Sequence, residues 1–273
     1  MNAPPLVIEA GRTERHYWRD LWRYRELFAF LAWRDILVRY KQTAIGVAWA
    51  ILQPFLTMIV FTIFGAWLHA DTGHVPRPVF VFTALLPWQF FSSALTSASN
   101  SLVNNSHLIS KVYFPRLIVP LSAVVTSLMD FFVSAIFLGL LMIFYHVPTS
   151  ANLLVLPAFI LLTFGAALGA GLWLTALNVK YRDFRFVLPF IVQLGLYVSP
   201  VAFTSDLVPN RFRALYALNP MVGIIDGFRW SILGQPIGSL GTSIAIAIAI
   251  VAVLIVSGIW FFRRTERTFA DII

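Results

Sequence analysis

One clear ionisable residue, Asp130, stands inside the long apolar stretch 117–144 of this sequence. A carboxyl group at the centre of a bilayer is costly and usually faces the interior of a helix bundle. Such a group can line a transport pathway. Alternatively, it can be protonated or hydrogen-bonded and fix the packing of the helices, and we favour this second role for Asp130. A carrier driven by an ion gradient needs several such groups, so we expect the energy for any transport to come from elsewhere.

The motifs that bind nucleotides or perform hydrolysis are absent from the sequence. There is no G-x-x-x-x-G-K-[ST] loop to hold a triphosphate, and no H-E-x-x-H or G-x-S-x-G motif. The five histidines are scattered and there is no cysteine, which excludes thiolate chemistry. We therefore expect no catalytic residue, no metal site and no cofactor in this chain.

Aromatic residues make up 15% of the sequence, and Trp49, Trp88, Phe90 and Phe91 lie deep within apolar stretches. Aromatic faces can stack on sugar rings through apolar contact. These four residues, together with Asp130, are therefore candidates for the lining of a channel. Aromatic side chains that face lipid would give the same pattern, so that alternative stays open.

The elements that position these side chains are membrane helices, because 59% of the residues are hydrophobic and only 12% are charged. A helix needs about 20 apolar residues to cross a bilayer. The second candidate span ends in the polar stretch 97–105, and the fifth carries Pro189, Gln193 and Pro200. The six candidate spans are 44–68, 79–101, 117–144, 153–178, 184–203 and 240–262. We predict an all-α polytopic membrane protein with a single domain over 1–273, in which 1–43 and 263–273 flank a six-span bundle at 44–262.

The basic residues indicate the orientation. With six spans, sixteen of the 20 Lys and Arg residues fall on the side that holds both termini. The positive-inside rule then places both termini in the cytoplasm. Because the net charge of +8 sits mostly at the edges of the apolar stretches, we expect no nucleic-acid partner.

Residues 17–41 are predicted to form an amphipathic helix in the membrane interface, either as a plain anchor or also as a partner surface. One stripe is charged and the other apolar. The charged stripe is Arg19, Arg23, Glu26, Arg34 and Lys41, and the apolar one is Trp18, Leu21, Trp22, Phe28 and Ala32. In the fourth span, Gly165 and Gly169 form a G-x-x-x-G face that packs either within its own bundle or against a second copy of the chain, and we favour the former.

The segment 204–239 is too apolar for a solvated loop and is predicted to form two short helices that dip in from the outer face and close the exit. The alternative is a pair of helices that lie on the surface and have no gating role. Asn219 and Pro220 are typical of a helix N-cap and first position. The apolar run 221–233 that follows is too short to span. Asp226 and Arg229 are three residues apart on this helix and are expected to pair.

Eight stretches of the sequence resemble the transmembrane subunits of the ABC-2 polysaccharide exporters, in order from about residue 30 to residue 235. No single stretch is diagnostic, but together and in this order they are specific. They are 33–43 (WRDILVRYKQT), 49–54 (WAILQP), 86–88 (LPW), 104–116 (ending KVYFPR), 178–183 (NVKYRD), 199–201 (SPV), 218–221 (LNPM) and 227–229 (GFR).

The resemblance implies a homodimer in the bacterial inner membrane, bound to two copies of a separate ATPase chain that holds ATP and Mg. It implies that the substrate is a glycan linked to undecaprenyl diphosphate and that membrane lipid is a further partner. It also assigns residues to three regions. The residues for ATPase coupling are Asn104, Asn105, His107, Lys111 and Tyr113. Those at the cytoplasmic interface are Arg34, Asp35, Arg39, Lys41, Arg182 and Asp183. Those of the outer gate are Asn219, Pro220, Asp226 and Arg229.

Two alternatives are weighed against this function. A drug or small-lipid exporter of the same ABC-2 class would share the same motifs. A membrane glycosyltransferase or polymerase would need acidic or metal-binding loops at the membrane surface, and the loops 69–78 and 145–152 hold one acid between them, Asp71. The sequence therefore favours a transporter over an enzyme.

Overall fold

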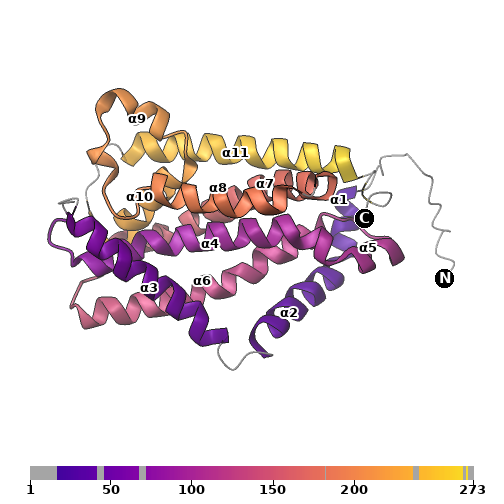
Figure 1. Ribbon diagram of the computed structural model, residues 1–273, viewed down its shortest axis with the longest axis horizontal. Helices are drawn as coiled ribbons and strands as arrows, with labels where there is room; N and C mark the ends of the chain where they lie inside the picture. The colour runs from indigo at the N-terminus through magenta and orange to yellow at the C-terminus, as the bar shows by residue number, and fades with distance from the viewer. Residues whose placement is uncertain are drawn as a thin grey trace.

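The computed structural model describes residues 17–41, 46–67, 72–181, 183–235, 240–266 and 269. Within these residues all regular structure is helical (Figure 1). The α-helices are α1 (Tyr17–Arg23), α2 (Arg25–Lys41), α3 (Gly46–Trp67), α4 (Arg77–Asn104), α5 (Ser106–Lys111), α6 (Ile118–Phe144), α7 (Leu156–Lys180), α8 (Phe184–Val198), α9 (Asn210–Tyr216), α10 (Pro220–Leu233) and α11 (Leu240–Thr265), with 3-10 turns η1 (Ala151–Val155) and η2 (Ser205–Leu207).

Four long helices are apolar enough to cross a membrane by length and composition, namely α4, α6, α7 together with η1, and α11. Two shorter apolar helices accompany them, 51–67 within α3 and the whole of α8. The predicted fifth span, 184–203, is shorter than expected because α8 ends at Val198, before Ser199 and Pro200. Its 15 residues reach about 22 Å, less than the roughly 30 Å of a bilayer core. The count of six spans therefore stays a prediction.

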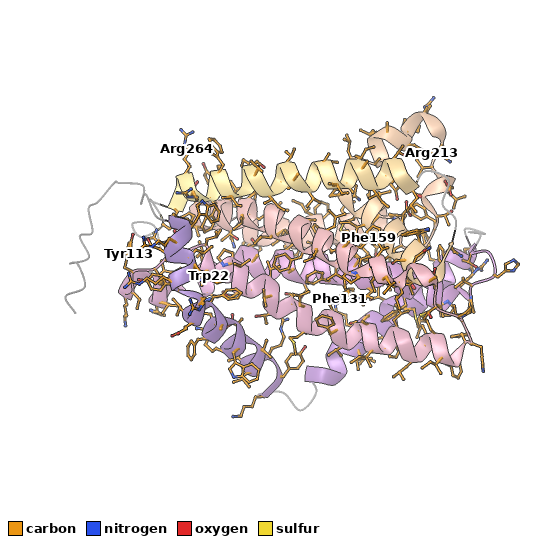
Figure 2. The ribbon with its side chains drawn as sticks, turned by 180° about the vertical axis from the view of Figure 1, so that it is seen from behind. Trp22, Tyr113, Phe131, Phe159, Arg213 and Arg264 are labelled. Carbon is orange, nitrogen blue, oxygen red and sulfur yellow. The ribbon has the colours of Figure 1, made fainter. Side chains whose placement is uncertain are left out.

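α4 is the central helix of an elongated bundle and packs against α3, α6, α7, α8 and α10. Figure 1 shows α1, α5 and the C-terminal end of α11 at one end, here called the α5 end, and α9 at the other, the α9 end. Figure 2 shows Tyr113 and Arg264 at the α5 end and Arg213 at the α9 end. Large apolar side chains such as Ile143 and Phe186, 73% and 81% exposed, lie on the outside of the bundle. An apolar exterior of this kind suits a lipid environment.

Small residues bring α7 and α11 into close contact, as predicted for a face that packs within the bundle. A Cβ atom at Gly169 would lie 2.7 Å from the backbone of Leu254 and Ile255, and one at Gly258 only 2.4 Å from the carbonyl oxygen of Gly169. Since real Cβ atoms do not approach so closely, this backbone contact requires glycine on both helices.

The predicted amphipathic helix is divided at Tyr24 into α1 and α2, and its apolar stripe divides as well. Ala32 is buried and Phe28 packs on the bundle, whereas Trp18 and Trp22 are 55% and 73% exposed. α2 packs along α6. Part of the apolar face of the predicted helix is therefore covered by the bundle and is not available to lipid.

The predicted C-terminal tail, 263–273, begins as part of the bundle. α11 continues to Thr265. Phe269 is fully buried and meets Phe262 edge to face, with ring centroids 5.4 Å apart.

Candidate functional site: a groove between five helices

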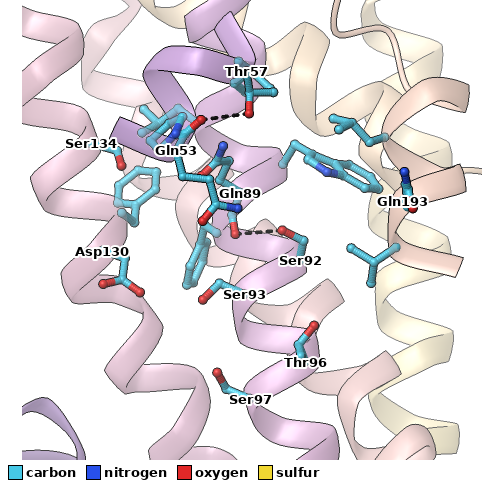
Figure 3. Close-up of a pocket in the computed structure, with 18 of the residues that line it drawn as sticks. Gln53, Thr57, Gln89, Ser92, Ser93, Thr96, Ser97, Asp130, Ser134 and Gln193 are labelled. Carbon is cyan, nitrogen blue, oxygen red and sulfur yellow. Dashed lines mark hydrogen bonds between the residues drawn. The ribbon is translucent and has the colours of Figure 1, made fainter. Parts of the chain in front are cut away.

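A groove of roughly 880 Å³ lies where α2, α3, α4, α6 and α8 meet (Figure 3). Its polar lining consists of amides and hydroxyls from α3, α4, α6 and α8, with charged groups at one edge. The polar residues are Arg39, Tyr40, Gln53, Thr57, Gln89, Ser92, Ser93, Thr96, Ser97, Asp130, Ser134 and Gln193. The other lining residues are apolar, among them Leu85, Phe131 and Leu196, and they make up most of the exposed lining. Amides and hydroxyls offer both donors and acceptors, so a groove that combines them with an apolar wall is suited to a neutral ligand with both hydroxyl and CH groups.

α4 supplies one continuous polar face to the groove. Gln89, Ser93 and Thr96 follow one another at spacings of four and three residues, which places them on one side of a helix. The Ser92 hydroxyl donates to the carbonyl oxygen of Gln89 at 3.1 Å, so this hydroxyl is satisfied within its own helix. The amide of Gln89 and the hydroxyls of Ser93 and Thr96 stand in the groove (Figure 3).

Aromatic side chains form part of the groove wall. The indole of Trp88 lies against α8 at Gly195, where an added Cβ would come within 2.6 Å of the ring. Phe90 packs on Phe131 of α6 with ring centroids 5.5 Å apart. Phe91 contacts Trp88 but does not line the groove. Trp49 belongs to α3, and its side chain lies outside the part of the chain that the structure describes.

Asp130 stands at the edge of the groove and is bound by α2. It forms an ion pair with Arg39, and the Tyr40 hydroxyl donates to its other carboxylate oxygen at 2.5 Å. Burial and the bond to Asp130 raise the pKa of Tyr40 above its usual value, so the hydroxyl keeps its proton. The geometry agrees with a hydrogen-bonded carboxyl that fixes helix packing, and it also places Asp130 on the groove surface.

The residues assigned to ATPase coupling gather at the α5 end. Asn104, His107, Lys111 and Tyr113 are exposed there. Asn105 differs, because its side-chain oxygen accepts a hydrogen bond from Arg34 at 2.8 Å. Four of the five residues could therefore contact a partner, while Asn105 holds α2 to the junction of α4 and α5.

The residues assigned to the cytoplasmic interface do not form one cluster. Arg34 contacts Asp35 at 2.7 Å as well as Asn105, and Arg39 lies further along α2 at Asp130. Lys41 is exposed at the end of α2, and Asp183 is exposed before α8. Arg182 lies outside the described residues.

The residues assigned to the outer gate lie together in α10, which is buried in the bundle. The Asn219 side chain caps α10 by accepting from the backbone N–H of Met221 at 3.0 Å, and Pro220 takes the first helical position, as predicted. Asp226 and Arg229 are 0% and 1% exposed. α10 contacts α4, α7 and α11, so it is not a helix lying on the surface.

The expected pairing of Asp226 with Arg229 is electrostatic only: their charges act on each other, but no hydrogen bond joins the two side chains. Neither carboxylate oxygen of Asp226 has a hydrogen-bond partner in the described part of the chain. Arg229 instead donates to the carbonyl oxygens of Val201 and Phe203 at 2.8 and 2.9 Å, and its guanidinium lies 3.7 Å from the ring centroid of Phe80. A planar guanidinium that stacks on a ring and donates to two carbonyls is held away from its neighbour on the helix.

Sequence reasoning missed the polar lining of the groove, although a signal was present. Ser97 and Gln193 are among the residues that made the second and fifth predicted spans polar, and both line the groove. Polar residues inside an otherwise apolar span usually face protein or water rather than lipid. Applied to Gln53, Gln89 and Gln193 together, that rule would have indicated a shared polar path.

Known proteins resemble this chain over most of its length. A family model described as "ABC-2 type transporter" matches residues 26–233. The O-antigen export system permease protein RfbA of Myxococcus xanthus is 28% identical over 252 residues, which cover 91% of this chain and 96% of that protein. A permease of the same name from Klebsiella pneumoniae is 26% identical over 254 residues, 91% of this chain and 95% of that protein. The polysialic acid transport protein KpsM of Escherichia coli is 24% identical over 242 residues, 86% and 91% of the two chains.

Proposed function

The chain belongs to the ABC-2 type transporter family, and we propose that it is the membrane subunit of an ATP-driven exporter of lipid-linked polysaccharide, with a glycan on undecaprenyl diphosphate as its substrate. Relatives named as O-antigen export permeases match nearly the whole chain, which supports a polysaccharide over a drug or a small lipid. The chain is a transmembrane subunit without an ATPase domain, so ATP and Mg are assigned to a partner chain.

The groove is the observation that carries this proposal. Its amides and hydroxyls can replace water around sugar hydroxyls, and its apolar wall can contact the CH groups of sugar rings, although Trp88 and Phe90 are themselves only 5% and 2% exposed. We therefore assign the groove to the glycan path. Because the groove is partly open, a second copy of the chain would supply its missing wall, as expected for a homodimer.

The two ends of the bundle are assigned to the two sides of the bacterial inner membrane. The α5 end, which holds the first described helix and the end of α11, is assigned to the cytoplasm together with both termini, and its exposed Lys111 and Tyr113 suit docking of two ATPase copies. The α9 end is assigned to the outside, with α10 as part of the gate. The contact of α10 with α4 supports this assignment, because α4 also carries polar residues of the groove.

The test of the groove uses isosteric apolar substitutions. Thr96→Val and Gln89→Leu remove polar groups from the groove, and each is expected to lower export about fivefold, which corresponds to about 1 kcal/mol for one lost hydrogen bond. Thr126→Val is the matched control, because the Thr126 hydroxyl donates to Ser122 within its own helix, away from the groove. Export is measured as surface glycan per cell together with the lipid-linked glycan left inside. Wild-type export by both groove variants, at equal protein amounts, would remove the groove from the path.

The class of substrate is tested separately in inverted membrane vesicles that contain the chain and its ATPase. ATP-dependent uptake of lipid-linked glycan is expected, without comparable uptake of a small fluorescent amphiphile. The opposite result would favour a drug or small-lipid exporter. The purified chain alone is expected to hydrolyse no ATP, since it lacks a phosphate loop.

A further inference from the structure

Three segments that are distant in the sequence are joined by one carboxyl group, that of Glu266, just beyond α11. One carboxylate oxygen accepts the backbone N–H of Arg116 at 2.8 Å, and the other accepts the hydroxyl of Tyr17 at 3.2 Å. The Arg116 guanidinium also donates to the backbone carbonyl of Glu266. Arg263 covers the ring of Tyr17, with its guanidinium carbon 4.4 Å from the ring centroid. We call Tyr17, Arg116, Arg263 and Glu266 the clasp.

The clasp rests on an apolar cluster at the α5 end. Leu117 and Phe114 are 5% and 4% exposed and flank Arg116, while Phe262 and Phe269 are fully buried on the side of Glu266. Burial raises the pKa of Glu266, and the Arg116 N–H and guanidinium act in the opposite direction. A buried carboxyl group that accepts hydrogen bonds from two segments fixes their geometry more tightly than apolar packing alone.

The position of Arg116 gives the clasp its significance. Arg116 lies in the turn between α5 and α6, five residues after Lys111. The other end of α5 is held by Asn105, which Arg34 of α2 contacts. The exposed residues between these two points, among them Lys111, Val112 and Tyr113, are therefore tied to α2 on one side and to α11 and α1 on the other, besides their chain connections to α4 and α6.

We propose that Glu266 is a positioning residue for ATPase coupling: through Arg116 and Tyr17 it links the docking segment 104–114 to α11 and α1, so that movement of the docked ATPase is transmitted to α11. This inference rests on the proposed function, in which the ATPase docks at the α5 end on residues 104–114, which include Lys111 and Tyr113. It assigns a role in coupling to the segment after α11, where the family match does not reach.

The first experiment needs no partner. The chain has no cysteine, so Val112→Cys and Arg264→Cys can carry spin labels at two exposed positions of the α5 end. Glu266→Ala is expected to broaden the distance distribution between the labels in the isolated chain. Glu266→Gln is expected to stay close to wild type, because its amide oxygen can accept from Arg116 and its NH₂ can donate to Tyr17. Glu26→Ala, at an exposed position of α2, is the matched control.

The second experiment measures coupling in the complex of the tagged chain with the ATPase that copurifies with it. Glu266→Ala is expected to lower glycan exported per ATP hydrolysed by about fivefold or more, the lower limit of typical coupling between sites. Glu266→Gln should restore most of the ratio, and Tyr17→Phe, which removes one hydrogen bond, should lie between them. A simple loss of folded protein would lower export and ATP hydrolysis together and leave the ratio unchanged.

Two outcomes would overturn the inference: an unchanged label distribution in Glu266→Ala, or an export-to-ATP ratio no lower in Glu266→Ala and Tyr17→Phe than in Glu26→Ala. Both leave the proposed function intact, since wild-type coupling would still be observed. The proposed function fails instead if the wild-type chain copurifies with no ATPase or exports no glycan.

Discussion

Arg229 is the largest fully buried side chain of the molecule among the residues that the structure describes. Its guanidinium holds the carbonyls of Val201 and Phe203, which belong to the non-helical stretch between α8 and α9. Backbone groups without helical partners need such donors when they are buried. Arg229 thus stabilises an irregular segment within the bundle and ties it to α10, while Asp226 lies nearby as the opposite charge.

At the residue scale we predict that Arg229→Ala is more damaging than Asp226→Ala. Loss of the arginine leaves two carbonyls without donors and Asp226 without a counter-charge, which should cost about 3–5 kcal/mol. Asp226→Ala should cost less, because Arg229 keeps its carbonyl partners. The double variant should cost less than the sum of the two, since the single changes share one interaction. Thermal unfolding of the purified chain in detergent provides the measurement.

Asp206→Ala is the control for this pair. Asp206 lies near the same end of the bundle, but its side chain is 42% exposed and its ion pair with Arg213 has an N–O distance of 3.8 Å. Exposed pairs of this kind contribute about 0–1 kcal/mol. A stability loss in Asp206→Ala equal to that in Arg229→Ala would contradict the special role of the buried arginine.

Among the elements, α7 and α11 pack with their backbones in direct contact, and their glycines decide the geometry of this contact. The sequence indicated this contact through the G-x-x-x-G spacing of Gly165 and Gly169, but it did not indicate the partner. Gly258 on α11 has no second glycine four residues before or after it, so it is not part of a G-x-x-x-G motif. Only the packed structure shows it against the carbonyl of Gly169.

At the element scale we predict opposite effects for two glycine-to-alanine changes in α11. Gly258→Ala places a methyl group where no space exists, and it should destabilise the bundle by about 1–3 kcal/mol. Gly241→Ala meets open space in the same helix, and it should be neutral or stabilise by up to about 1 kcal/mol through higher helix propensity. The stability changes of both variants are measured as shifts in the midpoint of thermal unfolding in the same detergent. Equal midpoints for the two variants would show that α7 and α11 can separate without cost.

The helices themselves were largely predictable, whereas the groove was not. Apolar length placed the long helices, and Asn219 with Pro220 marked the start of α10. The groove requires that α2 lie along α6, so that Arg39 and Tyr40 reach Asp130, and that Gln193 of α8 face α4. These are contacts between distant segments, which periodicity within one helix cannot specify.

For the whole molecule, the two ends of the bundle differ in chemistry as well as in position. The α5 end carries the first and last described residues, Tyr17 and Phe269, and the exposed Lys111 and Tyr113. The α9 end carries exposed apolar residues of α9, among them Leu215 at 67% exposure. The proposed orientation rests on this asymmetry, together with the excess of Lys and Arg that the sequence places on the side of the termini.

The orientation is tested with single cysteines, because the chain contains none of its own. Leu215→Cys is expected to react with a membrane-impermeant maleimide added to spheroplasts. Val112→Cys, which is also exposed, should react only after the membrane is opened. The cysteine-free chain provides the unlabelled control. The reverse pattern would invert the topology and place the α5 segment away from any cytoplasmic ATPase.

The contact between Tyr17 and Glu266 also bears on biosynthesis, because it joins residues 249 positions apart. At translation rates of about 5–20 residues per second, Tyr17 is added to the chain roughly 12–50 s before Glu266. During that interval α1 and the turn at Arg116 have no carboxyl group to bind. The docking end of the permease is therefore completed only when the last helix has been synthesised and inserted, so a chain that is cut short before residue 266 lacks the contact that finishes this surface.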